Sequence, residues 1–357
     1  MQLIRLLAFV AGLVLIFATL RSVIRTFVLP RSANDRLTRA VFVSTRRLFN
    51  IFTERATSYA ERDRLMAYYA PVSLLALLPV YLAIIMCGYA GVYYALGVED
   101  VFEAFKVSGS SLLTLGIAQA AGSGPTIVIF SEATLGLIMV ALLIAYLPTM
   151  YASFSRREST VTMLEVRAGS PPSAVEMLLR YQRIHGLDQL GDVWRTWEVW
   201  FAELEETHSS LPALAFFRSP QPEHSWITAA GAILDAAALT NAVVDLPHDA
   251  QADLCLRAGY LALRHIADFF LMDYERSPKP TDPISVSRQE FEAACDQLAQ
   301  GQVPLKADRE AGWRAFNGWR VNYDTVLIDL AGLTMAPYAP WSSDRSRLHK
   351  NTTSRST

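Results

Sequence analysis

The chain has 357 residues, of which 52% are hydrophobic and 18% are charged. A charged fraction below the roughly 25% of soluble domains indicates a membrane protein, whereas a mean hydropathy of only +0.23 requires a large soluble part. The 32 basic and 34 acidic residues nearly balance, which excludes the strongly basic profile of a nucleic-acid-binding protein. Three cysteines, far apart and without metal-ligand spacing, predict buried thiols in a reducing cytoplasm.

Residues 1–29 predict a first transmembrane helix. The run 3–29 is apolar, with Arg5, Arg21 and Arg25 near its ends, where long side chains reach the membrane surface. The alternatives are an uncleaved signal-like segment and an interfacial helix. No small-x-small cleavage site follows the run, which argues against a signal peptide. Residues 30–65 then form a linker in which arginines outnumber carboxylates, and we predict that this basic linker is cytoplasmic.

Two long apolar segments flank a short amphipathic segment. Residues 66–98 carry no charged side chain and residues 126–155 carry only Glu132, and each segment is long enough to cross about 30 Å of hydrocarbon. Between them, residues 101–113 are amphipathic and lead into a Thr-Leu-Gly turn. Non-helical backbone at membrane depth is tolerated only when it is buried in protein or lines a water-filled cavity. The sequence therefore predicts a pore module over residues 66–158.

The segment Thr114-Leu115-Gly116-Ile117-Ala118 resembles the filter of the potassium-channel-like family that has two membrane helices per pore loop, where Thr-Val-Gly-Tyr-Gly is usual. Ser110 and Ser111 stand upstream, where that family carries hydroxyl residues. Residues 126–158 resemble its inner helix, with a glycine, a proline and a basic cytoplasmic exit. The resemblance covers under a third of the chain.

This resemblance implies a homotetramer in which backbone carbonyls of Thr114 to Ala118 replace the water shell of a permeant cation. It implies that Ser110, Ser111 and Glu132 support the filter, and that Gly136 and Pro148 act in gating. Gly116 suits a left-handed backbone, and Ala118 in that conformation would cost on the order of 1 kcal/mol. Three departures (Ile117, Ala118 and Gln119) point to a pore for potassium or for mixed potassium and sodium.

The distribution of arginines predicts the orientation of the chain in the cell membrane. The linker 30–65 is rich in arginine, whereas residues 97–125 contain a single basic residue, Lys106. Because basic loops stay on the cytoplasmic side, we expect the pore loop outside. Three crossings then place the amino terminus outside and the carboxyl-terminal region in the cytoplasm.

Residues 159–339 predict an all-α cytoplasmic domain, and residues 340–357, rich in Ser, Thr and Arg, predict a disordered tail. Apolar residues at helical spacing and proline breaks indicate the helices. These are expected over residues 173–185, 187–207, 226–245, 250–274, 287–300 and 306–333. The fold class is thus an all-α membrane protein with three transmembrane helices, a re-entrant loop and this domain.

The remaining conspicuous residues have structural interpretations. A tryptophan stripe that includes Trp194 and Trp197 predicts core rather than a ligand cage. The histidines are dispersed, and we find no nucleophile constellation, phosphate loop or metal motif in the sequence. We therefore expect no enzyme, no cofactor and no metal site. The alternative to a channel is a non-conducting, membrane-anchored helical scaffold or sensor protein whose partner binds the cytoplasmic domain.

Overall fold

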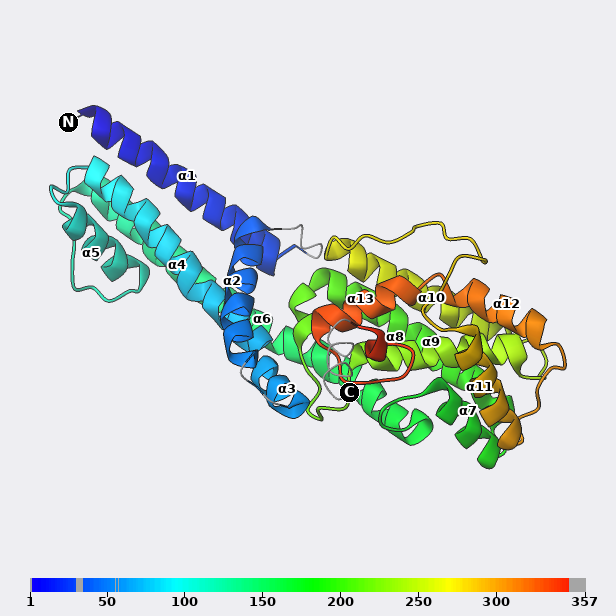
Figure 1. Cartoon of the computed structure of the whole chain (residues 1–357). Helices are drawn as coiled ribbons and strands as arrows, with labels where there is room; N and C mark the ends of the chain where they lie inside the picture. Colours follow the sequence, from blue (N-terminus) through cyan, green and yellow to red (C-terminus); the bar gives the residue numbers. More distant parts are fainter. Residues whose placement is uncertain (1, 30–34, 55, 57, 347–357) are drawn as a thin grey trace. The chain divides into compact units, whose positions relative to one another are not determined.

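The computed structural model describes residues 2–29, 35–54, 56 and 58–346. Apart from one isolated β-bridge between Val244 and Leu305, these residues form helices and connecting loops (Figure 1). The chain divides into two compact units, which are described separately. Unit 1 comprises Met1–Ala56 and Leu65–Ala152, and unit 2 comprises Thr57–Arg64 and Ser153–Thr357.

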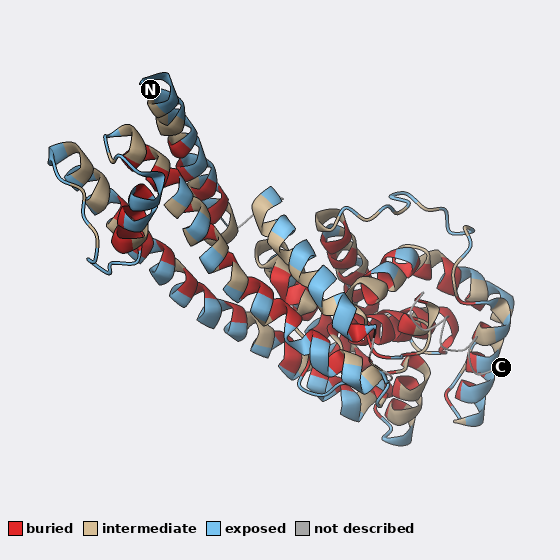
Figure 2. Ribbon diagram, turned by 60° about the vertical axis from the view of Figure 1, so that its left-hand side comes forward, coloured by how far each residue is buried: buried red, intermediate tan, exposed pale blue. Residues whose placement is uncertain are grey.

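Within the described residues, four helical stretches are long and apolar enough to cross a membrane. They are Gln2–Phe27, Tyr59–Ala95, Ser123–Ala168 and Trp226–Val243. Figure 2 shows that the helix at the amino terminus is exposed along much of its length, as expected for a surface that faces lipid. The stretch Trp226–Val243 differs, because 94% of it is buried inside the protein. It is therefore the central helix of unit 2.

Unit 1 is built on the antiparallel contact between α1 (Gln2–Phe27) and α4 (Tyr69–Ala95). A Cβ atom on Gly12 would lie 2.4 Å from the carbonyl oxygen of Gly88, and one on Gly91 would lie 2.8 Å from that of Ala8. Small residues at such contacts let two helix backbones approach closely, which is how helices associate in lipid. At the other end of the contact, Ser22 of α1 bonds Tyr81 of α4 at 3.1 Å.

The remaining helices of unit 1 are α2 (Arg36–Thr53), which precedes the predicted pore module, and α5 (Val101–Leu112) and the first part of α6 (Ser123–Ala168), which lie within it. Helix α2 runs along α4, and the short helix α5 also packs on α4. Helix α6 follows the loop after α5 and continues into unit 2 without a break. The bounds that the sequence predicts for α4, α5 and the start of α6 lie within a few residues of the observed bounds.

Unit 2 is a bundle around the alanine-rich helix α9. Helices α7, α10, α12 and α13 contact α9, and α8 packs on α10. At the centre, Arg320 is fully buried and pairs with Asp235 of α9 and with Asp324, to which its Nε donates at 2.8 Å. The helix bounds are α3 (Tyr59–Ala67), α7 (Ala174–Arg183), α8 (Leu190–Ser210), α9 (Trp226–Val243), α10 (Ala250–Phe269), α11 (Arg288–Gln300), α12 (Arg309–Arg320) and α13 (Asp324–Thr334).

Two expectations about the membrane-side elements need correction. Residues 30–65 are not a simple linker, since they contain α2 and most of α3. The Asp35 carboxylate caps α2 by accepting from the backbone amides of Leu37 (3.1 Å) and Thr38 (2.9 Å). Helix α6 extends ten residues beyond the expected end at residue 158, because Val161, Leu164 and Ala168 are buried in the core of unit 2.

Two further differences lie near the carboxyl end. The helix expected over residues 306–333 is two helices, because the Asn322 side chain donates to the Gly318 and Trp319 carbonyls at the end of α12. Residues 341–346, expected to be disordered, are packed on unit 2. The Trp341 carbonyl accepts from Arg320, and the Trp341 ring lies 5.6 Å from that of Phe316. The rest of the predicted tail lies outside the described residues.

Candidate pore loop

The segment between α5 and α6 has the backbone features of a constrained loop. Gly116 has φ +69°, as the sequence led us to expect. The expectation for Ala118 is wrong: it is not among the residues with positive φ, and Thr114 takes that place with φ +55°. A β-branched residue in the left-handed region is a rare and strained conformation. The strain therefore lies at the first residue of the motif, not at its last.

Ser110 holds this loop against the end of α5. Its carbonyl oxygen accepts from the amide of Leu115 at 2.8 Å, and its hydroxyl oxygen accepts from the amide of Ala118 at 3.0 Å. The amide of Thr114 in turn donates to the Ser111 carbonyl at 3.0 Å. Because the amides of Thr114, Leu115 and Ala118 are engaged, the loop has a defined shape even where its side chains are exposed.

The carbonyl oxygens of the loop differ from its amides in their hydrogen bonding. Within the described part of the chain, the carbonyls of residues 114–117 accept no hydrogen bond. The side chains of Leu115 and Ile117 are 57% and 80% exposed. A row of four consecutive carbonyls with no internal partner is a set of oxygen ligands that a hard monovalent cation could use.

Glu132 is fully buried, so it is not a carboxylate exposed among lipid headgroups. The Tyr93 hydroxyl of α4 donates to its Oε2 at 2.9 Å, and the Ser108 hydroxyl of α5 donates to its Oε1. One turn away, the Ser111 hydroxyl donates to the Ile129 carbonyl at 2.8 Å. A buried carboxylate is tolerated where it is hydrogen-bonded. Glu132 thus joins α4, α5 and α6 directly behind the loop.

Gly136 contacts α5 one turn further along α6. A Cβ atom on Gly136 would lie 2.1 Å from the Leu112 carbonyl oxygen. Glu132 and Gly136 are four residues apart and face Ser108 and Leu112, which are also four residues apart. The two helices therefore share a register that ends where the loop begins. Helix α6 is continuous through Gly136 and Pro148. The structure gives Gly136 a packing contact, and a gating role for either residue stays a prediction.

The predicted site residues thus gather on one side of unit 1, with the exception of Pro148, which lies three turns beyond Gly136 on α6. Sequence reasoning missed Ser108 and Tyr93, the two partners of Glu132, and the strained backbone of Thr114. Ser108 lies in a serine-rich helix, and that composition could have indicated a hydroxyl partner for Glu132. Nothing in the sequence pairs Tyr93 with Glu132, because the two residues come from different helices 39 positions apart.

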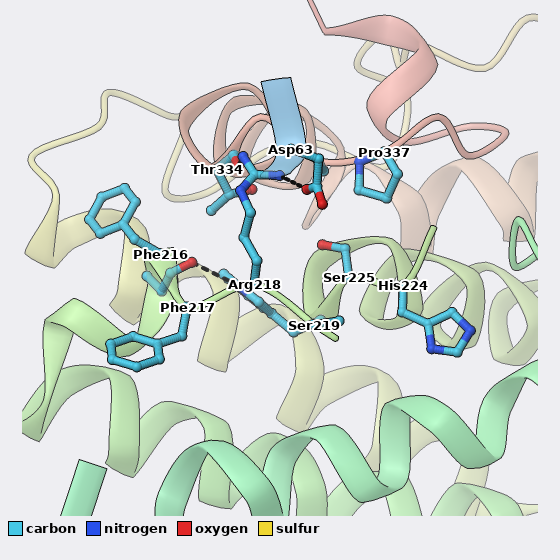
Figure 3. Close-up of a pocket in the computed structure, with 12 residues that line it drawn as sticks. Asp63, Phe216, Phe217, Arg218, Ser219, His224, Ser225, Thr334 and Pro337 are labelled. Atoms are coloured by element: carbon cyan, nitrogen blue, oxygen red, sulfur yellow. Dashed lines mark hydrogen bonds and ion pairs between the residues drawn. The ribbon is translucent and has the colours of Figure 1, made fainter. Parts of the chain in front are cut away.

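Unit 2 contains another candidate site, a small pocket lined by Asp63, Arg218, Ser219 and His224 (Figure 3). Arg218 pairs there with Asp63 and donates to the Thr334 carbonyl at 2.7 Å. The cavity measures about 20 Å³, which is room for roughly one water molecule. A pocket of this size holds no organic ligand, and its charged residues serve to join segments of unit 2.

A second buried cluster adjoins this pocket and centres on Arg157. The guanidinium pairs with Glu158 at 2.8 Å and donates to the carbonyls of Leu214 (2.8 Å) and Phe217 (2.7 Å). Its Nη1 lies 3.1 Å from Nε2 of His208. Burial, reinforced by the positive charge of Arg157, holds the pKa of His208 well below 6.5. His208 is therefore neutral, with Nδ1 donating to the Leu204 carbonyl at 3.0 Å and Nε2 accepting from Arg157.

The tryptophans of α8 are core residues, as the sequence predicts: Trp194, Trp197 and Trp200 are each at most 3% exposed. Among the described residues, no group of three His, Cys, Asp or Glu side chains is placed to hold a metal ion. Comparison with protein-family models, with curated proteins and with solved structures finds no match for this chain. The geometry of the loop and its resemblance to a filter are therefore the basis for a functional assignment.

Proposed function

We propose that this chain is one subunit of a tetrameric cation channel, with the filter at Thr114 to Ala118. The observation that carries the proposal is the series of carbonyls at residues 114–117, which accept no hydrogen bond within the described residues, while the amides of Thr114, Leu115, Gly116 and Ala118 are engaged. Four copies of the loop around one axis would surround an ion with these oxygens. The permeant ion is potassium, or potassium together with sodium.

The surroundings of the loop support this proposal. Carbonyl oxygens bind ions selectively only when the loop that carries them keeps its shape. Here Ser110 accepts from three amides of the loop, and the buried carboxylate of Glu132 joins the three helices behind it. The contact between Gly136 and Leu112 sets the position of α5 along α6. Polar residues in a membrane protein are costly, so a buried network of this kind favours a functional site.

The proposal includes three membrane crossings, by α1, α4 and the first part of α6. The fourth apolar helix, α9, is 94% buried in unit 2 and is the core of a domain that we assign to the cytoplasm. With the basic segment 30–65 inside, the loop after α5 faces outward and the amino terminus lies outside. Ion flow is then passive, and unit 2 is the part that regulates it or binds a partner.

A flux measurement on purified protein in liposomes tests the proposal. Wild-type protein should carry potassium, and Gly116→Val should abolish the flux without preventing tetramer assembly, because valine at φ +69° distorts all four loops. Gly124→Val is the matched control, since a side chain at that position meets open space.

Two outcomes would contradict the channel. Wild-type protein that carries no cation at any voltage or pH would favour the non-conducting, membrane-anchored alternative. A flux that survives Gly116→Val would mean that ions pass elsewhere. The paired change Ile117→Tyr with Ala118→Gly should raise the preference for potassium over sodium, since it restores the residues usual in the family that the loop resembles.

A further inference from the structure

Helix α2 combines exposed arginines with exposed apolar side chains. Residues 36–53 contain four arginines and no carboxylate. Arg36 and Arg47 are exposed and, at 3.6 residues per turn, lie on one line along the helix about three turns apart. Leu48, Ile51 and Phe52, each more than half exposed, all lie to one side of that line, with Ile51 nearest to it and Phe52 furthest round the helix. We call Arg36, Arg47, Leu48, Ile51 and Phe52 the α2 surface.

Three exposed arginines of α1 and α2 have no acidic partner among the described residues. Within the described ranges, no carboxylate pairs with Arg36, Arg47 or the exposed Arg21 of α1. The carboxylate between α1 and α2, Asp35, is occupied by the Ser22 hydroxyl at 2.6 Å and by the α2 backbone. Unit 2 differs: Arg309, for example, contacts both Glu292 and Asp296. The positive charges of Arg21, Arg36 and Arg47 are therefore left for an external anion.

The position of α2 in unit 1 specifies where that anion lies. The hydrogen bond from Ser22 to Asp35 joins the start of α2 to the end of α1. The hydroxyl of Tyr81 lies 2.9 Å from that of Thr38, and the Tyr69 hydroxyl donates to the Phe42 carbonyl at 3.2 Å, so α2 is fixed along the first half of α4. Because α1 and α4 are both long enough to cross a membrane, the α2 surface stands where two crossings leave the bilayer.

We propose that the α2 surface binds the anionic lipid headgroups of the cytoplasmic leaflet, with Arg21 contributing from α1. A helix with arginines along one edge and Leu, Ile and Phe beside them is suited to an interface, where phosphates neutralise the charge and the apolar side chains enter the acyl boundary. The cytoplasmic leaflet carries the anionic lipids. The proposal requires unit 1 to lie in a membrane, but it does not require the protein to conduct ions.

A fluorescent reporter on α2 tests the proposal with the full chain. Ser44 is exposed and lies on the same face as Leu48 and Ile51, so a dye on Ser44→Cys, with Cys87→Ala, reports on that surface; Cys255 and Cys295 are buried. The protein is reconstituted in phosphatidylcholine with increasing fractions of phosphatidylglycerol. Quenching by brominated lipid chains and by aqueous iodide then measures how far α2 enters the membrane surface.

We expect protection from iodide to rise with the phosphatidylglycerol fraction and to weaken at high salt. Replacing Arg21, Arg36 and Arg47 by Gln should raise the anionic fraction needed for half protection, since each arginine near an anionic surface contributes roughly fivefold to binding. Replacing three exposed arginines of unit 2, Arg195, Arg257 and Arg314, by Gln removes the same charge and should leave protection unchanged.

Two results would overturn the proposal. Protection that is equal in neutral and anionic vesicles, and indifferent to salt and to the arginine variants, would mean that anionic lipid does not bind the α2 surface. Protection already present in detergent, without lipid, would mean that a second copy of the chain covers α2.

Discussion

Gly136 of α6 lies so close to Leu112 at the end of α5 that a Cβ atom would come within 2.1 Å of the Leu112 carbonyl oxygen. Because the obstacle is backbone, no side-chain rotation can relieve the contact. The carbonyl belongs to the last residue of α5, directly before the candidate filter. Gly136 therefore determines how closely the loop approaches the inner helix, whether or not α6 also bends there.

Gly136→Ala should displace α5 and lower the cation flux at least tenfold, with a loss of stability of about 1–3 kcal/mol, as is usual for overpacking. Flux in liposomes and thermal unfolding in detergent measure the two effects. Gly124→Ala, at a position of the same helix where a Cβ meets nothing within 4 Å, should leave both unchanged. If the two variants behave alike, the contact does not position the loop.

Glu132 gives a second prediction for the same region. Glu132→Leu leaves the Tyr93 hydroxyl without its buried acceptor, which costs about 1–3 kcal/mol. It also removes the bond from Ser108, whose hydroxyl keeps the Met86 carbonyl at 3.0 Å as an acceptor. We expect a destabilised tetramer with little flux, measured by size-exclusion chromatography and ion flux. Glu132→Gln keeps one acceptor oxygen and should retain the tetramer. Wild-type behaviour of Glu132→Leu would show that the three helices do not need this carboxylate.

The orientation can be measured with single cysteines in a Cys87→Ala background. Ser123 is exposed at the start of α6, and Ser170 is exposed beyond its end. Because the arginine-rich segment 30–65 should stay inside, an impermeant maleimide should label Ser123→Cys on intact cells. It should label Ser170→Cys only after permeabilisation. The opposite pattern would invert the topology, and with it the assignment of the loop as the outer mouth.

His208 predicts how the stability of unit 2 depends on pH. The folded protein keeps this imidazole neutral, whereas the unfolded chain protonates it near pH 6.5. The contribution to stability is therefore complete above pH 6.5 and falls by up to about 1.4 kcal/mol per pH unit below that value. All seven tryptophans lie between residues 194 and 341, so their fluorescence in the full protein reports on unit 2.

Two substitutions serve as controls, and each is compared with the wild type by the slope of its unfolding midpoint against pH. His208→Gln should flatten the dependence of the unfolding midpoint on pH between pH 6.5 and 5. Glutamine has no side-chain group that is neutral in the folded protein and protonated in the unfolded chain. His185→Gln, at an exposed position, should leave the slope as in the wild type. An unchanged slope in His208→Gln would show that other groups cause the loss of stability in acid.

The sequence by itself determined most of the segments that are helices and which of them, in unit 1, are long and apolar enough to cross a membrane. Long apolar runs with few charges located α1, α4 and the first part of α6, and proline and glycine located most helix ends in unit 2. These properties are local: they depend on the side chains within one segment and on the solvent that surrounds it. The position of the loop between α5 and α6, with glycine at 116 in a left-handed conformation, followed for the same reason.

Only the tertiary structure decided what each buried polar or small residue contacts. The pairing of Glu132 with Tyr93, the approach of Gly136 to Leu112 and the fully buried Arg320 each join segments that are distant in sequence. The length of α6 and the order of residues 341–346 also depended on burial against other helices. Periodicity reports that a side chain is buried but not which side chain lies opposite, because the partner is chosen by packing between segments rather than by propensity within one.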